Sequence, residues 1–143
     1  MAITTNAICN SFKKELLEAK HNFSTAPTGN NFKLAMYTSA ATLGKSTTSY
    51  TTGSEVTSPA GYTAGGKALV NTGTSVATSV AITDFSDLSF TNVTLTARGA
   101  LIYNTSNSNT GVCVLDFGSD KTATAGTFTI KFHKRSTSFY FYE

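Results

Sequence analysis

The sequence predicts a mainly β protein, a single-domain antiparallel β-sandwich with one N-terminal α-helix; a β-barrel is the alternative. Thr and Ser account for 26 and 16 of the 143 residues, and β-branched residues favour strands. Short apolar stretches alternate with polar residues, and turn residues separate them roughly every 8 to 12 positions, as in a sandwich. The length suits one domain, so we expect residues 1–143 to fold as one unit.

Residues 6–21 have the pattern of a helix. The segment contains no Gly or Pro, and its apolar residues recur at spacings of four, four and three: Ile8, Phe12, Leu16 and Ala19. This apolar stripe must be buried. We expect it to pack on the domain's own sheet, and the alternative is a neighbouring subunit.

The β-sandwich is expected over residues 32–132, beginning with a half-buried strand at 32–38. Residues 39–61 are small and polar and predict a long loop, of the kind that often binds a partner. Gly65-Gly66 suits a turn or bulge where a side chain would clash. Further strands are expected at 67–71, 76–83, 88–96, 97–103, 112–117 and 127–132, with a bulge near Thr91-Asn92 and a hairpin loop at 104–111. Residues 133–143 form a basic and then aromatic tail.

No set of residues in the sequence has the pattern of a catalytic centre, so we expect no enzyme activity and no cofactor. His21 and His133 lie at the ends of predicted elements, where surface positions are expected. Asp116 stands in an apolar strand. We expect it to pair with Arg98 or to cap a turn, and a calcium site with Asp120 is the less favoured alternative, because calcium needs six to eight oxygen ligands.

Charge and hydropathy limit the classes of partner that we expect, and the N-terminal residues and the cysteines give two further expectations. The net charge is +3 and the basic residues are spread along the chain, so nucleic acid is not an expected partner. No window approaches 18 apolar residues, so no membrane partner is expected either. The first residues lack a signal-peptide pattern, which indicates synthesis in a cytoplasm. For Cys9 and Cys113, two buried free thiols are favoured over a disulfide.

Several segments, taken in order, resemble a family of small virion proteins of tailed bacteriophages. They are ICNSFKKELL from Ile8 with HNF at 21–23, FKLAMYT at 32–38 with ATLG at 41–44, EV at 55–56 with GYTAGG at 61–66, Phe90 to Asn104 ending in ARGALIYN, VLDFG at 114–118, and TAGTFTI at 124–130. Together they cover most of residues 8–132.

The resemblance implies a non-enzymatic structural component of the phage particle, a capsid decoration protein or a tail component. It would be made in the bacterial host cytoplasm and located in the virion. The partners would be other virion proteins, such as the major capsid or tail proteins, and a symmetric homo-oligomer is expected. Candidate subunit-contact residues are Phe12, Leu16, Tyr50, Phe139, Tyr140, Phe141 and Tyr142.

The alternative function is a receptor- or carbohydrate-binding module at the tail tip or on the particle surface. Such sites often present exposed aromatic side chains. The candidate tyrosines for this alternative are Tyr37, Tyr50, Tyr62 and Tyr103.

Overall fold

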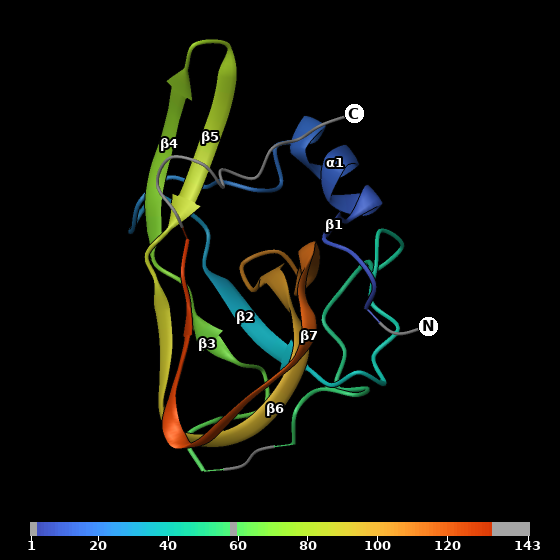
Figure 1. Ribbon diagram of the computed structural model, residues 1–143. Helices are drawn as coiled ribbons and strands as arrows, with labels where there is room; N and C mark the ends of the chain where they lie inside the picture. Colours follow the sequence, from blue (N-terminus) through green and yellow to red (C-terminus); the bar gives the residue numbers. More distant parts are fainter. Residues whose placement is uncertain (1–2, 58–59, 133–143) are drawn as a thin grey trace.

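The structure is a computed structural model that describes residues 3–57 and 60–132. It confirms the predicted fold class: a five-stranded antiparallel sheet, a separate two-stranded sheet and one short N-terminal helix (Figure 1). The elements are β1 (Ala7–Ile8), α1 (Asn10–Leu17), β2 (Phe32–Tyr37), β3 (Lys67–Ala68), β4 (Asn71–Ala77), β5 (Val80–Phe85), β6 (Leu88–Asn104) and β7 (Thr110–Ile130). The large sheet has the order β1-β7-β6-β2-β3, so different strands form its two edges and it does not close into the alternative barrel.

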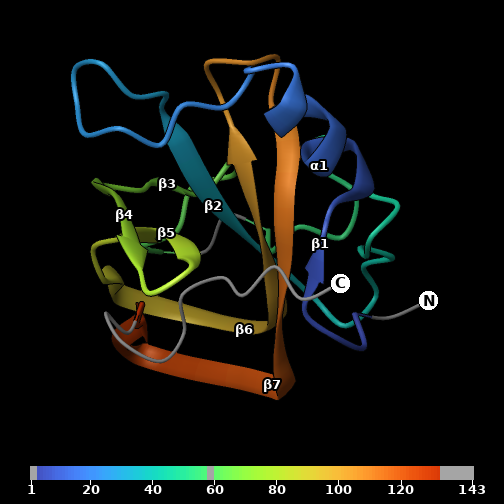
Figure 2. The same ribbon diagram turned by 90° about the horizontal axis from the view of Figure 1, so that it is seen from above.

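β6 and β7, the two longest strands of the large sheet with 17 and 21 residues, form one long hairpin. Near the hairpin loop, residues 99–104 of β6 lie between β7 and β2 in the sheet. Farther away, residues 88–97 pair with 121–130 of β7, and the ribbon turns sharply between the two parts (Figure 2). The register is irregular at this turn, because Ala97 pairs with Lys121 whereas Gly99 pairs with Asp116. The separate strands expected at 88–96 and 97–103 are therefore one bent strand.

The bulge predicted near Thr91-Asn92 is confirmed. The β6–β7 register shifts between Phe90 and Val93, and Asn92 has a φ of 51°. Asn tolerates this left-handed conformation better than most residues. The shift returns Val93 and Leu95 to the buried side, which explains why the apolar parity changes there.

The helix is shorter than the predicted 6–21. Ala7 and Ile8 pair with β7, and Cys9 is extended with φ −63° and ψ 133°, so the helix begins at Asn10. It ends at Leu17, and Ala19 adopts a φ of 57°. Phe12 is only 1% exposed and Ile8 packs against the same core, so the first half of the apolar stripe lies on the domain's own core as expected. Leu16 and Ala19 are exposed, so the second half of the stripe does not.

The single strand predicted over 76–83 is wrong. β4 and β5 form a hairpin in which Ala77 pairs with Val80 across a tight turn, and Thr78 has a φ of 57°. Directly paired residues share a face of a sheet, so Val76 lies with Ala81 on one face and Val80 lies on the other. The even spacing of the two valines imitates one strand, but the reversal of the chain separates them.

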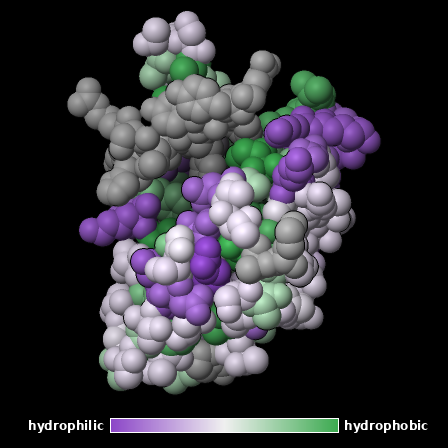
Figure 3. Space-filling model, turned by 45° about the vertical axis from the view of Figure 1, so that its right-hand side comes forward, coloured by the Kyte–Doolittle hydropathy of each residue, from purple (hydrophilic) through white to green (hydrophobic). Residues whose placement is uncertain are grey.

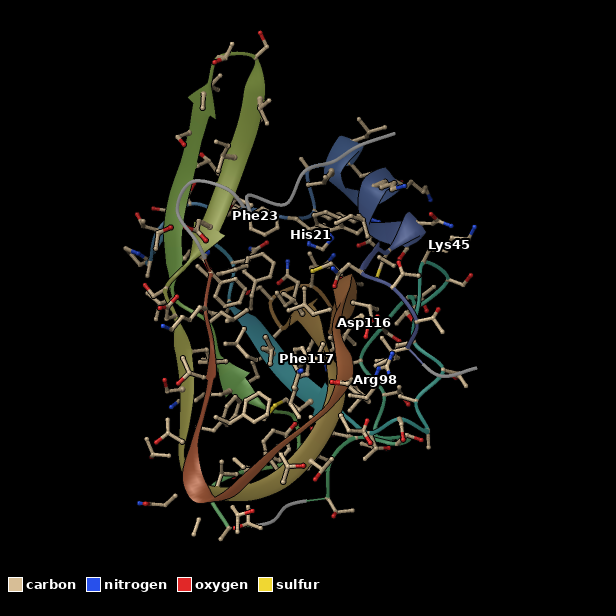
Figure 4. The ribbon with its side chains drawn as sticks, viewed as in Figure 1. His21, Phe23, Lys45, Arg98, Asp116 and Phe117 are labelled. Atoms are coloured by element: carbon tan, nitrogen blue, oxygen red, sulfur yellow. The ribbon has the colours of Figure 1, made fainter. Side chains whose placement is uncertain are left out.

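An aromatic cluster joins the base of this hairpin to the large sheet. Phe85 of β5 packs against Phe23, Phe32 and Phe132, with ring centroids 5.7 to 6.2 Å apart. Phe23 stacks on Phe32 at 4.5 Å, and His21 and Phe23 both lie beside this junction (Figure 4). The hairpin is therefore anchored at its base, and the rest of it projects from the molecule (Figure 1).

Candidate functional site

In its described residues, 39–57 and 60–61, the predicted loop forms isolated bridges but no strand, and a buried carboxylate holds its end against the sheet. Glu55 is 7% exposed and forms an isolated bridge with Tyr37 of β2. Its Oε2 accepts a hydrogen bond from the Tyr50 hydroxyl at 2.6 Å. Its Oε1 accepts from the Tyr62 hydroxyl and from the Gly65 N–H, both at 2.7 Å. One carboxylate thus ties together residues 50, 62 and 65 of the same loop region.

The tyrosines around Glu55 form a packed polar cluster. The rings of Tyr50 and Tyr103 stack at 4.7 Å, and the Tyr103 hydroxyl donates to the Gly65 carbonyl at 2.6 Å. The Tyr62 hydroxyl also accepts from the backbone N–H of Met36 in β2 at 2.9 Å. Burial raises the pKa of Tyr103 to about 12 and, with the hydrogen bonds to Glu55 as a further cause, moves the pKa values of Tyr50 and Tyr62 higher still.

These pKa shifts decide what the cluster can do. A tyrosine that holds its proton so firmly is a poor general acid and a poor nucleophile near neutral pH. Both oxygens of Glu55 are already engaged by donors. The cluster is therefore a structural anchor for the loop. The tyrosines proposed for carbohydrate contact are largely inside: Tyr37, Tyr62 and Tyr103 are at most 4% exposed.

A second polar network joins α1 to the end of β6. The expectation that His21 lies at the surface is wrong, because its side chain is fully buried and its Nε2 lies 2.6 Å from Oε2 of Glu15. Its Nδ1 lies 2.9 Å from Nδ2 of Asn104, a residue with 0% exposure. The Asn104 amide also donates to Asn30, and its oxygen accepts from the Ser106 N–H. The imidazole is thus fixed on both nitrogens. His133 lies outside the described residues.

Arg98 and Asp116 form the third polar pair, as the sequence predicts. Arg98 Nε lies 3.2 Å from Asp116 Oδ1, and both side chains are largely buried (Figure 4). The same carboxylate oxygen accepts from the Gly118 N–H, which is the turn-capping alternative also expected for Asp116. In the part of the chain that the structure describes, no three His, Cys, Asp or Glu residues are grouped to hold a metal ion. The pairing with Asp120 expected of a calcium site is not seen.

An open groove follows the concave side of the bend in β7. Its volume is about 560 Å³, and Asp116 and Phe117 lie on its wall. Apolar and hydroxyl side chains alternate with two lysines along it: Leu115, Lys121, Thr122, Ala123, Thr127, Phe128, Thr129, Ile130 and Lys131. The groove is wide and shallow, and a well-formed small-molecule site would be more enclosed.

The exposed apolar side chains gather on the β4–β5 hairpin and on α1. Val76 is 73% exposed and Val80 41%, and Val70, just before β4, is 63% exposed. Leu17, at the end of α1, is 91% exposed. In Figure 3 the projecting hairpin at the top has pale and hydrophobic colours, whereas the surface of α1 is mostly hydrophilic. The hairpin is the part of the described surface that most resembles a protein contact.

The predicted subunit-contact residues differ in their exposure. The prediction for Phe12 is wrong, because its side chain lies in the core of its own chain, in contact with the rings of His21 and Phe23. Leu16 is 37% exposed and remains available. Tyr50 is half-buried, and its hydroxyl and ring are both engaged within the chain. Phe139, Tyr140, Phe141 and Tyr142 lie outside the described residues.

Sequence reasoning missed two features, the Glu55 anchor and the projecting hairpin. A signal for the anchor exists, because Glu55 is the one acidic residue between Lys20 and Asp84. A signal for the hairpin is the tandem repeat TSVA-TSVA at 74–81, whose second Thr-Ser can form a turn. Both thiols are free and buried, as favoured from the sequence.

No family model, no curated protein and no solved structure matches this chain. A search of the described residues for a membrane-crossing helix finds none of the necessary length and apolarity.

Proposed function

We propose that the chain is a non-enzymatic structural component of a tailed bacteriophage particle, an accessory subunit of the capsid or tail that assembles through protein–protein contacts. The resemblance of segments across residues 8–132 to small virion proteins supports the assignment to a phage particle. The β4–β5 hairpin supports the assembly role. The location would be the virion, after synthesis in the host cytoplasm.

The projecting hairpin is the observation that carries the assembly role. A two-stranded hairpin is at best marginally stable in water unless it packs on something. Among the residues that the structure describes, the hairpin packs at its base, through Phe85, while Val76 and Val80 are exposed. A partner that covered these valines would remove apolar surface from water and stabilise the hairpin at the same time.

The polar clusters support the same role. Glu55 and His21 form hydrogen bonds that hold loop segments against the sheet, and Asp116 is engaged by Arg98 of β6 and by the Gly118 N–H within β7. Titratable groups that are engaged in hydrogen bonds within the chain suit a rigid subunit that uses its surface to bind other proteins. The partners would be other virion proteins and further copies of the same chain.

The test is the location and copy number of the protein in purified particles. We expect quantitative mass spectrometry to find many copies per particle. Cryo-microscopy should place the domain at symmetry-related positions on the capsid or tail. Absence from purified particles, with the protein remaining in the soluble fraction of the lysed host, would overturn the proposal. A hit on a glycan array with wild-type protein would favour the receptor-binding alternative.

A further inference from the structure

We propose that β4 pairs with β4 of a second copy across a two-fold axis, so that two hairpins form a four-stranded antiparallel sheet in the order β5-β4-β4-β5. The inference rests on the proposed function, because a subunit present in many copies on a particle meets its own kind at high local concentration. To the proposed function it adds the identity of one partner, a second copy of the chain, and the strand that makes the contact, β4.

The first argument is that the outer edge of β4 is open. In the described residues β4 pairs on one side only, with β5, in its own two-stranded sheet. The residues from Thr74 to Ala77 are all exposed. An open edge presents unpaired N–H and C=O groups that a further strand can satisfy.

The second argument is that this edge has none of the usual protection. Proteins block open edges with Lys, Pro, inward-pointing charges or bulges. From Ala68 to Thr83 the chain contains no charged residue and no Pro. The one irregularity, between Asn71 and Gly73, lies at the base of the hairpin and leaves the strand beyond it regular.

The third argument identifies a second copy as the partner. When a strand pairs with its own copy across a two-fold axis, a charged residue on the axis faces the same charge on the other copy. A strand without charged residues avoids this repulsion, whereas a charged strand is better suited to a partner of complementary charge. β4 is neutral throughout.

The register follows from the strand length. β4 runs from Asn71 to Ala77, so we place the axis at its middle residue, with Thr74 opposite Thr74 of the second copy. Thr–Thr is a favourable cross-strand pair. The alternative strand, β5, is less suited, because Asp84 would approach the axis and Phe85 is held in the core at its base.

The experiment compares two substitutions with the same chemistry and opposite positions in the hairpin. Thr74 and Thr83 are paired residues of β4 and β5 on one face. Thr74→Lys sets two ammonium groups against each other at the axis, whereas Thr83→Lys puts the same charge one strand farther away. Sedimentation equilibrium on the full chain should show a wild-type dimer, a dissociation constant raised about tenfold or more by Thr74→Lys, and little change for Thr83→Lys.

A cross-linking measurement tests the geometry without weakening the contact. Cα atoms of directly opposed antiparallel residues lie about 4.5 to 5.5 Å apart, which a disulfide can bridge. Thr74→Cys should form a covalent dimer on mild oxidation, and Thr83→Cys should not. The native thiols, Cys9 and Cys113, are buried and do not compete.

The inference is overturned if the wild-type chain is monomeric at high micromolar concentration and Thr74→Cys fails to cross-link. It is also overturned if both lysine variants weaken the dimer equally, since the contact would then lie elsewhere. Either result leaves the proposed function standing when the protein is still found in particles. Absence from particles would refute the function even if the purified chain dimerised.

Discussion

At the scale of single residues, one carboxylate organises the longest loop of the domain. Glu55 accepts three hydrogen bonds of 2.6 to 2.7 Å, within the range of charge-assisted bonds. Hydrogen bonds to charged groups contribute more than neutral ones, and leaving a buried partner unsatisfied costs still more. The ring of Tyr50 closes the cluster by stacking on Tyr103.

Replacing this carboxylate by an amide should therefore destabilise the fold. In Glu55→Gln the NH₂ group faces a donor, the Tyr50 hydroxyl, which must turn its proton away. We expect a loss of about 1–3 kcal/mol in the free energy of unfolding, measured by urea denaturation. The matched control is Glu18→Gln, which removes the exposed carboxylate paired with Lys14 and Lys20. An equal effect of the two substitutions would contradict the anchoring role of Glu55.

At the scale of elements, the short strand β3 depends on a close approach between two backbones. Gly66, immediately before β3, has a φ of +73°, and a Cβ atom there would lie 1.8 Å from the Leu34 carbonyl oxygen of β2. The neighbouring pairs, Lys33 with Ala68 and Leu34 with Lys67, hold β3 on the edge of the sheet. The clash expected from the sequence at Gly65-Gly66 is thus confirmed at Gly66.

Gly66→Ala should separate β3 from β2, because both the conformation and the space exclude a side chain. We expect a loss of about 2 kcal/mol or more in the free energy of unfolding. Gly44→Ala, in the same loop region, is the control, since a Cβ atom there meets nothing within 4 Å. Thermal denaturation of both variants would decide the matter. A Gly66→Ala protein as stable as the Gly44→Ala protein would refute the close approach.

At the scale of the whole molecule, the core controls the response to alkaline pH. Burial, with a smaller contribution from Glu15, raises the pKa of Cys9 from 9.0 to about 12, and burial raises that of Tyr103 from 10.0 to about 12. The folded state therefore keeps protons that the unfolded state releases. Between the pKa values of the free groups, 9.0 and 10.0, and the value of about 12 in the folded chain, the unfolded state binds fewer protons than the folded state. The free energy of unfolding must therefore fall as the pH rises through this range.

We expect the urea midpoint to be constant below pH 9 with respect to these groups and to fall steadily as the pH approaches 12. Cys9→Ala removes one of the groups, so its midpoint should fall less steeply over this range. The slope is the readout, because the substitution also removes packing contacts and lowers the midpoint at every pH. Parallel slopes for the two proteins would argue against a role for the Cys9 thiol.

Much of the fold could be predicted because it depends on local pattern. Alternation in residues 88–95 indicates one buried face, and the parity change at Asn92 indicates a bulge, since side chains of a strand alternate between faces. The alternation at 32–38 correctly predicted a strand, but the prediction that it is half-buried is wrong, because Ala35 and Tyr37 on its second face are also fully buried. The pairing of Arg98 with Asp116 was also predictable, because a carboxylate in an apolar strand needs a partner. The strand and bulge follow from a residue and its immediate neighbours, whereas for Asp116 the local pattern indicated only that a partner was needed, and the structure shows it to be Arg98, 18 residues away.

The sequence by itself determined the mainly β class, the single helix at the N-terminus, the free thiols and the long loop that follows β2. The tertiary structure alone decided where the helix begins, because β1 takes Ala7 and Ile8 into the sheet. It alone decided that 71–85 is a projecting hairpin, and that Glu55 and His21 are buried. The physical reason is the same in each case: these outcomes depend on contacts between residues far apart in the chain, which a local pattern does not encode.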